Sequence, residues 1–161
     1  MAIPIVRPIR PTDNASVAQI IRTVMPEFGC VGPGFSIEDP EVDDMYHAYQ
    51  GERAAFYVVE LEGQILGCGG FAPLAGGDPG ICELKKMYFL SSLRGMGMGH
   101  QMIEQCLEDA RKAGFHTMYL ETVYRMEAAN ALYQKKGFTA CPQMGNTGHS
   151  GCDTFYTLSL T

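Results

Sequence analysis

The sequence has no cluster of basic residues and no long hydrophobic run. Lys and Arg together number 12 against 18 Asp and Glu residues, which gives a formal net charge of −6. Nucleic acids and anionic membranes bind clustered positive charge, so the sequence argues against both kinds of partner. The longest apolar run, Ala54 to Val59, is far shorter than the ~20 residues that span a bilayer.

The cysteines lack the spacing of a disulfide scaffold or a metal site. There are 6 cysteines, irregularly spaced and without a Cys-x-x-Cys pair, and residues 1–14 contain no hydrophobic signal-peptide core. We therefore expect reduced thiols in a cytoplasmic protein. Cys141, His149 and Cys152 form an imaginable zinc site, but no fourth ligand is evident and the spacing matches no standard pattern, so no metal is expected.

The sequence does contain the composition of one ordinary globular domain. Hydrophobic residues make up 46% and charged residues 19% of the 161 positions. No repeat, low-complexity stretch or linker divides them. A chain of this size buries roughly 70% of the surface that it exposes when unfolded. We expect a single domain over residues 1–161.

Hydrophobic periodicity and turn residues predict the order of elements. Strands are expected at residues 3–9, 54–61, 64–71, 81–90, 117–123, 138–141 and 154–160. Helices are expected from Asp13 to Pro26, from Asp39 to Tyr49, and over residues 98–113 and 126–136. Glu62-Gly63 predicts a type I′ hairpin turn, and the prolines of the first strand suit a sheet edge. The expected fold is α/β (α+β), a mixed sheet with helices on its faces.

A glycine-rich turn follows the fourth expected strand. The segment Met87-Tyr88-Phe89 leads, through Leu90 to Leu93, into Arg94-Gly95-Met96-Gly97-Met98-Gly99 and then an amphipathic helix. Glycine permits unusual φ angles and close approach of a ligand. The free N–H groups of the first helical turn add an anion site, for which a diphosphate is the natural ligand. The alternative is a turn that serves only tight packing.

Two familiar nucleotide-binding motifs do not fit this turn. A Walker A loop ends in Gly-Lys-Ser/Thr, whereas His100 and Gln101 follow Gly99. The dinucleotide motif GxGxxG requires glycine at position 100 and follows the first strand of its unit. Neither class of nucleotide is expected.

The turn resembles the Arg/Gln-x-x-Gly-x-Gly/Ala motif of the GNAT superfamily of acetyl-CoA-dependent N-acetyltransferases. A second segment, Ala129-Asn130-Ala131-Leu132-Tyr133-Gln134-Lys135-Lys136-Gly137-Phe138, is similar to that superfamily's Asn-x-x-x-Tyr-x-x-x-Gly-Phe segment. The two motifs stand in the family's order, and the element order agrees over essentially the whole chain. One departure is Ser91, where many members have proline.

The resemblance implies a mostly antiparallel seven-stranded sheet with about four helices, in which the fourth and fifth strands splay apart. Acetyl-CoA would lie in that gap, with its pantetheine arm on the backbone of residues 87–89 and its pyrophosphate on the N–H groups of residues 94–99. Asn130 would face the cofactor, and Tyr133 lies on the same helical face.

Acetylation of an amine requires a base, an oxyanion donor and an acid. The amine must lose a proton, the thioester oxygen gains negative charge, and the leaving thiolate benefits from a proton. Tyr133 is the candidate acid, because the pKa of tyrosine is ~10 and close to that of a thiol. The alternative is a core aromatic residue. A backbone N–H near Met87 or Tyr88 is the candidate oxyanion donor.

Glu83 is the candidate base. It lies on the strand implied to bind the cofactor, and strand alternation predicts that Glu83, Lys85 and Met87 face the same side. Carboxylates are rarely buried without a partner, so one near the centre of a sheet has reason to be functional. The alternative is a structural ion pair with Lys85 or another cation.

Residues outside these motifs leave alternatives open. His149 would reach the acceptor pocket or be solvated or hydrogen-bonded locally. Glu121 would bind the acceptor amine or be a solvated or paired strand residue. Cys82 and Cys106 are interpreted as small buried hydrophobic residues. The resemblance implies that the loop of residues 28–35 forms a second wall of the acceptor pocket.

The sequence thus predicts an enzyme that transfers an acetyl group from acetyl-CoA to the primary amine of a small molecule. Direct attack in a ternary complex is expected, because no cysteine is marked as a nucleophile. The alternatives are a non-catalytic acyl-CoA-binding or sensor domain and a protein acetyltransferase acting on lysines or N-termini. The resemblance also allows a homodimer.

Overall fold

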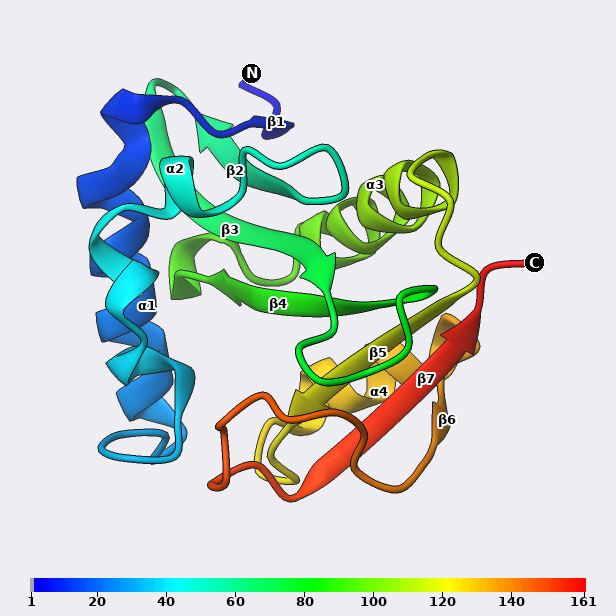
Figure 1. Cartoon of the computed structure of the whole chain (residues 1–161). Coiled ribbons are helices and arrows are strands. Elements are labelled where there is room, and N and C mark those ends of the chain that lie inside the picture. Colours follow the sequence, from blue (N-terminus) through cyan, green and yellow to red (C-terminus); the bar gives the residue numbers. More distant parts are fainter. Residues whose placement is uncertain (1) are drawn as a thin grey trace.

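Residues 2–161, which the computed structural model describes, form a seven-stranded sheet in the order β1-β2-β3-β4-β5-β7-β6 (Figure 1). β4 and β5 are parallel and the other neighbours are antiparallel. The strands are β1 Ile5–Pro8, β2 Ala55–Leu61, β3 Gln64–Pro73, β4 Ile81–Phe89, β5 Thr117–Thr122, β6 Thr139–Ala140 and β7 Thr154–Ser159. The mixed, mostly antiparallel sheet of the prediction is confirmed.

Helices cover both faces of this sheet. The helices are α1 Asn14–Glu27, α2 Met45–Ala48, α3 Met98–Lys112 and α4 Glu127–Lys135. α1 and α2 enclose one hydrophobic cluster, which includes Ile21 and Met45. α3 and α4 enclose the other, which includes Met102 and Tyr133. None of the helices in residues 2–161 is both long enough and apolar enough to cross a bilayer.

Local turn chemistry explains two confirmed predictions. Glu62 and Gly63 have φ angles of 51° and 77°, and Leu61 pairs directly with Gln64. Two positive φ angles are the requirement of a type I′ turn, which glycine meets without strain. β1, which ends in Pro8, lies at the edge of the sheet, where a missing N–H costs no ladder hydrogen bond.

The segment before β2 differs from its prediction. The expected helix from Asp39 to Tyr49 is broken into a 3-10 turn at Pro40–Asp43 and the single-turn α2. Asp44 interrupts it because its side chain accepts from the His47 N–H and caps a new helix. Asp39 occupies the N-cap position before Pro40, but its side chain makes no cap hydrogen bond to this turn.

The first helix also ends slightly later than predicted. α1 includes Pro26 in its last turn and ends one residue further, at Glu27. Pro26 lies in the last turn of α1, so the helix loses one N–H donor there, and only Glu27 continues the helix after it.

A β-bulge at Lys86 changes which side chains of β4 share a face. Tyr88 pairs with Cys68 and Lys85 with Gly70, so β4 carries one extra residue, and Lys86 has a φ of 54°. Met87 therefore packs in the α3 cluster beside Leu84, on the face opposite Glu83. The predicted common face of Glu83, Lys85 and Met87 is wrong at Met87.

β4 and β5 separate beyond Glu83. They pair only where Ile81–Glu83 meets Thr117–Tyr119, although β4 continues to Phe89 and β5 to Thr122. The predicted splay is confirmed. From Leu84 onward, the edge of β4 that faces β5 has no partner strand within residues 2–161, which leaves main-chain groups for a ligand.

Candidate active site

A cavity of about 550 Å³ opens beside the diverging strands and the start of α3. This volume is typical of a ligand site. Most predicted cofactor-binding residues line it: Met87, Tyr88, Phe89, Arg94, Gly95, Gly97, Met98 and Gly99. Met96 does not line it and is exposed. We call this cavity the larger cavity.

The three glycines of the turn are required for two different structural reasons. Gly95 and Gly97 have φ angles of 82° and 77°, and an added Cβ would contact nothing within 4 Å, so the backbone conformation itself favours glycine. An added Cβ at Gly99 would lie 2.8 Å from Leu132 Cδ2 on α4. Gly99 thus has the packing role of the alternative, whereas packing does not explain Gly95 and Gly97, and the ligand-binding role of the turn stays a prediction.

The turn presents a row of main-chain donors to the larger cavity. The Arg94 N–H donates to the Ser91 carbonyl at 3.2 Å, so its predicted place among the free donors is wrong. The N–H groups of residues 95–99 donate to no acceptor within residues 2–161, and the first N–H of α3 to donate backward is that of Gln101, to Gly97. Such free N–H groups at a helix N-terminus bind anions. Lys135 and His100 add basic side chains to the lining; the sequence motifs did not indicate either residue.

Asn130 lies beside the larger cavity and does not line it. Its Nδ2 donates to the carbonyl groups of Val123 at 3.1 Å and Tyr124 at 3.4 Å, and so ties α4 to the turn after β5. Its Oδ1 is buried and has no hydrogen-bond partner among residues 2–161. A buried acceptor left open in this way fits a ligand N–H, so the cofactor contact of Asn130 stays a prediction.

These features together fit the implied cofactor. The free N–H groups suit a pyrophosphate, the unpaired edge of β4 suits the amides of a pantetheine arm, and the cavity connects the two. Acetyl-CoA carries both chemical groups in this order, with its thioester at the far end.

A second, narrow cavity of about 50 Å³ lies on the other side of the β4 bulge. The two cavities share Met87, Tyr88 and Met126, so they meet where β4 turns away from β5. Cys30 and Phe35 line the narrow cavity, so the loop of residues 28–35 forms one of its walls; that this is the acceptor pocket stays a prediction. Its polar lining includes Glu83, Glu121, Tyr133 and His149.

Glu83 enters the narrow cavity as a buried carboxyl group, only 4% exposed. Neither a hydrogen bond nor an ion pair holds it within residues 2–161, so the alternative of a structural pair with Lys85 is wrong; the Lys85 ammonium instead lies 5.9 Å from the Tyr49 ring centre. Burial raises the pKa of Glu83 to about 7, the charge of Glu121 adds to the rise, and Lys85 opposes it.

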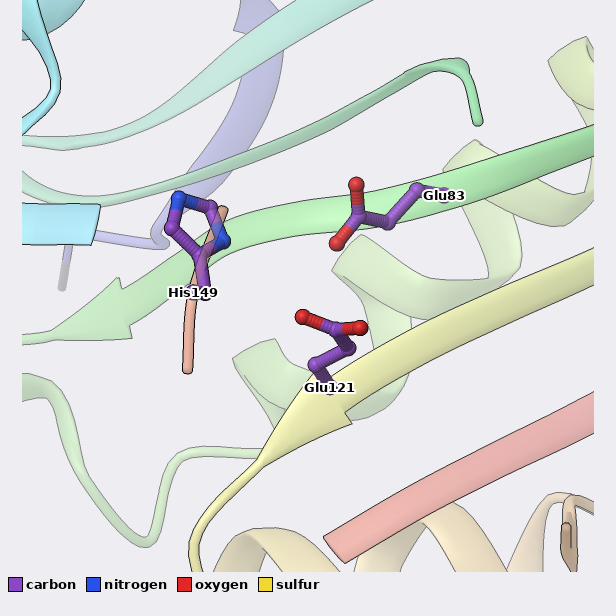
Figure 2. A group of neighbouring side chains, drawn as sticks. All are labelled: Glu83, Glu121 and His149. Carbon is purple, nitrogen blue, oxygen red and sulfur yellow. The ribbon is translucent and has the colours of Figure 1, made fainter. Parts of the chain in front are cut away.

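Glu83 from β4, Glu121 from β5 and His149 from the loop before β7 converge, as Figure 2 shows. One ligand-type atom of each lies within 4.8 Å of the other two. Glu121 accepts hydrogen bonds from the hydroxyl groups of Tyr119 at 2.7 Å and Thr147 at 2.6 Å. This set of acceptors can hold a cation, and it differs from the Cys141, His149 and Cys152 combination of the sequence analysis.

His149 is neither solvated nor bonded only locally, so that interpretation is wrong. It is buried, and its Nε2 lies 3.0 Å from both carboxylate oxygens of Asp39, 110 positions away. The second ring nitrogen points toward Glu83 and Glu121 (Figure 2). Because a carboxylate only accepts, Nε2 carries the proton that it donates to Asp39.

Asp39 and Lys86 link the surrounding segments. The Lys86 side chain is fully buried, and its Nζ donates to Asp39 at 2.7 Å and to Glu41 at 2.9 Å. Burial works to raise the pKa of Asp39, but the hydrogen bonds from His149 and Lys86 outweigh it and hold that pKa at about 2. The sequence analysis missed this role of Asp39, whose sequence neighbours indicated only a helix start.

Tyr133 lines the narrow cavity from α4. Its ring packs 5.9 Å from the ring centres of Phe138 and Tyr156, as the core-aromatic alternative expects. Its hydroxyl group makes no hydrogen bond to any group of residues 2–161. Burial raises the pKa of Tyr133, which keeps the hydroxyl protonated. Both predicted catalytic side chains therefore border one cavity.

The cysteines are all free, as expected. Burial raises the pKa of Cys82 to about 12, and that of Cys106 rises for the same reason, in agreement with their interpretation as buried hydrophobic residues. Cys152 borders the narrow cavity, and burial raises its pKa to about 12 as well. A nucleophilic cysteine needs the opposite shift.

Comparisons with known proteins agree with this arrangement. A family model described as the Acetyltransferase (GNAT) family matches residues 17–138. The chain is 40% identical over 152 residues to the uncharacterized N-acetyltransferase YjgM of Escherichia coli (strain K12), over 93% of this chain and 91% of that protein.

Solved structures share the fold. An acetyltransferase of the GNAT family from Staphylococcus aureus Mu50 superposes with a TM-score of 0.82 at 17% identity, over 99% of this chain and 100% of that one. The structure of yncA from Salmonella typhimurium with its cofactor acetyl-CoA gives a TM-score of 0.80 at 22% identity, over 98% and 94% of the two chains. The chain belongs to the GNAT family of acetyltransferases and is an acetyl-CoA-dependent acyltransferase.

Proposed function

We propose that this acetyltransferase transfers the acetyl group directly to the primary amine of a small molecule. The observation that carries the proposal is the buried, unpaired carboxyl group of Glu83 in the narrow cavity, next to the end of the larger cavity. One cavity suits the acyl donor and the other suits the acceptor. Reaction would occur where they meet, at Met87 and Tyr88.

The main chain supports the placement of the acyl donor. N–H groups of residues 95–99 bind the pyrophosphate, and the unpaired edge of β4 beyond Leu84 binds the pantetheine arm. This path leads the thioester from the turn to the bulge at Lys86. A main-chain N–H near Met87 then stabilises the negative charge on the thioester oxygen.

Glu83 serves as the general base. A carboxyl group with a pKa of about 7 is sufficiently ionised at neutral pH and is a stronger base than an ordinary carboxylate. The carboxylate of Glu83 takes one proton from the bound ammonium group and passes it to solvent, which frees the lone pair of the nitrogen for attack. Once the nitrogen–carbon bond has formed, Glu83 takes a second proton from the nitrogen and releases it to solvent in turn.

Tyr133 serves as the general acid. Its raised pKa keeps the proton on the hydroxyl until a strong base develops nearby. When the carbon–sulfur bond breaks, the leaving thiolate takes the hydroxyl proton, and the products are the acetamide and free CoA. The proton later returns to Tyr133 from solvent.

Direct transfer is favoured over a covalent acetyl-enzyme. The thiols nearest the narrow cavity, Cys30 and Cys152, both have pKa values raised first of all by burial, and nucleophilic catalysis by cysteine needs the thiolate. An acceptor amine and acetyl-CoA would therefore be bound together.

The size of the narrow cavity favours a slender acceptor. A volume of about 50 Å³ holds a few water molecules or the end of an alkylamine. A purely acyl-CoA-binding domain would have no use for Glu83, because a buried carboxyl group without a partner costs stability.

The test is an acceptor screen with the purified chain, in which free thiol is measured during incubation with acetyl-CoA and single amines. Small primary amines should increase the release of CoA well above its hydrolysis, and mass spectrometry should find an acetamide. Acetylation of peptide lysines or N-termini, without any small-molecule product, would replace small-molecule transfer by protein acetylation. Saturable binding of acetyl-CoA with no product on any amine would favour the sensor domain.

A further inference from the structure

We infer that the acceptor is an aliphatic primary amine with a net positive charge, not a zwitterionic amino acid, and that Glu121 selects it. This inference rests on the proposed function of the narrow cavity. Its basis is the juxtaposition of two carboxylates, the buried Glu83 on β4 and the half-buried Glu121 on β5, that no cation of residues 2–161 pairs with (Figure 2).

Each carboxylate lacks a positive partner in a different way. Glu83 is 4% exposed, and no group of the described chain bonds to it. Glu121 receives two hydrogen bonds, both from neutral hydroxyl groups, those of Tyr119 and Thr147. Two neighbouring carboxylates in a largely enclosed site repel each other, and either a proton on Glu83 or an entering cation relieves that repulsion. The site therefore attracts positive charge from its ligand.

The charged groups around the pair do not supply this charge. The buried ammonium of Lys86 is shared by Asp39 and Glu41. Asp39 also takes the Nε2 proton of His149. Lys85 lines the cavity, but its ammonium lies toward the Tyr49 ring. The cavity and its immediate surroundings thus contain more carboxylates than ammonium groups, and this excess of negative charge favours a cationic acceptor. The carboxylates are those of Asp39, Glu41, Glu83 and Glu121, and the ammonium groups are those of Lys85 and Lys86.

The spacing fits one ammonium group. Two hydrogen bonds of about 2.8 Å from one tetrahedral nitrogen reach oxygens about 4.6 Å apart, and the ligand-type atoms of Glu83, Glu121 and His149 lie within 4.8 Å of one another. A single primary ammonium bridges Glu83 and Glu121, and its remaining N–H lies on the side of His149. Glu121 then holds the nitrogen while Glu83 takes its proton.

An α-carboxylate on the acceptor works against this arrangement. In an amino acid the carboxylate is bonded to the carbon that carries the amine, so it would enter the cavity together with the ammonium. It would lie among Glu83, Glu121 and the Asp39 cluster and cancel the charge that draws the amine in. An alkylamine brings only the positive charge.

The test compares pentylamine with norleucine, which is pentylamine with a carboxylate on the amine-bearing carbon, at saturating acetyl-CoA. We expect kcat/KM to be at least about 10-fold higher for pentylamine, a ratio that corresponds to one unit of log affinity. In Glu121→Gln, the KM for pentylamine should rise about 10-fold with kcat within about 3-fold of wild type, and the preference over norleucine should shrink.

Matched variants separate a role in binding from a role in folding. Glu108→Gln alters a glutamate on the exposed face of α3, where it pairs with Lys112, and should leave KM unchanged. Equal or better use of norleucine by the wild type, or an unchanged KM in Glu121→Gln, would overturn the inference while leaving amine acetylation intact. Product formation with neither compound nor any other amine would overturn both.

Discussion

The larger cavity and the narrow cavity are built in different ways. The larger cavity presents the main chain of one continuous segment, the end of β4, the glycine turn and the start of α3, and side chains of α1 and α4 complete its wall. The narrow cavity is lined by side chains from segments far apart in the sequence, among them Glu83, Glu121 and His149, and Asp39 lies behind it, bonded to His149. The comparison teaches that, under the proposed assignment of the two cavities, a backbone shape would recognise the acyl donor and a particular set of charges would recognise the acceptor.

The two cavities also differ in charge. The larger cavity presents free N–H groups and the basic residues His100 and Lys135, which suit an anion. The narrow cavity presents Glu83 and Glu121, which suit a cation. The extra residue of β4 at Lys86 stands between them. If the acceptor is the cation that we propose, this separation keeps the anionic donor and the acceptor apart except at their reacting ends.

The largest effect should come from removing the base of the narrow cavity. In Glu83→Gln, kcat should fall about 100- to 1,000-fold, because an amide cannot accept the amine proton, and general bases contribute on this scale. The affinity for acetyl-CoA, measured by calorimetry, should change less than about 2-fold. Turnover close to wild type would remove Glu83 from the mechanism.

The next effect concerns the acid at the junction of the cavities. Tyr133→Phe keeps the packed ring and removes the hydroxyl, so kcat should fall about 10- to 100-fold, within the lower range for general acids. Tyr156→Phe is the matched control, since the Tyr156 ring packs against Tyr133 but does not line the narrow cavity. Equal activities of the two variants would mean that Tyr133 has only a packing role.

A smaller effect should follow from altering the turn of the larger cavity. Gly97→Ala forces a side chain into a φ of 77°, moves the N–H groups that bind pyrophosphate, and should weaken acetyl-CoA binding about 10-fold. Gly63→Ala is the control, because Gly63 has the same φ and an equally open surrounding in the β2–β3 hairpin.

Both glycine variants should lose about 1 kcal/mol of stability through the left-handed conformation, and only Gly97→Ala should lose affinity. Calorimetric titration with acetyl-CoA and urea unfolding measure the two quantities separately. An equal loss of affinity in Gly63→Ala would show that the effect comes from instability and not from the turn.

The smallest effect is on stability. The raised pKa of Glu83 means that the folded chain binds this proton more tightly than the unfolded chain, whose pKa is near 4.5. Stability is therefore lost as the pH rises from about 4.5 through about 7. At pH 8, Glu83→Gln should stabilise the chain by on the order of 1 kcal/mol, and at pH 5 by almost nothing. Melting curves with the same shift at both pH values would contradict this.

Much of the larger cavity could be predicted from the sequence. Alternating glycines after a strand, followed by an amphipathic helix, specify a local conformation, and neighbouring residues in the chain supply the binding groups. The hairpin at Glu62-Gly63 was predictable for the same reason, because its φ angles depend on the turn residues themselves.

The narrow cavity could be predicted only in part. Glu83 was found through its position on a strand and Tyr133 through the family motif that contains it. The link between His149 and Asp39 joins residues 110 positions apart, and no local pattern encodes it. The bulge at Lys86 depends on the same contacts, because ion pairs to Asp39 and Glu41 hold a non-glycine residue at a φ of 54°. Tertiary contacts of this kind decide which face a side chain occupies.

The most direct test of the account is the pH dependence of kcat for the wild type and Glu83→Gln with pentylamine. The wild type should show a rise with a midpoint near pH 7, where Glu83 ionises, well below the range near pH 10 in which an alkylamine itself loses its proton. Glu83→Gln should lack this rise. The same rise in both proteins would contradict the assignment of the buried carboxyl group as the base.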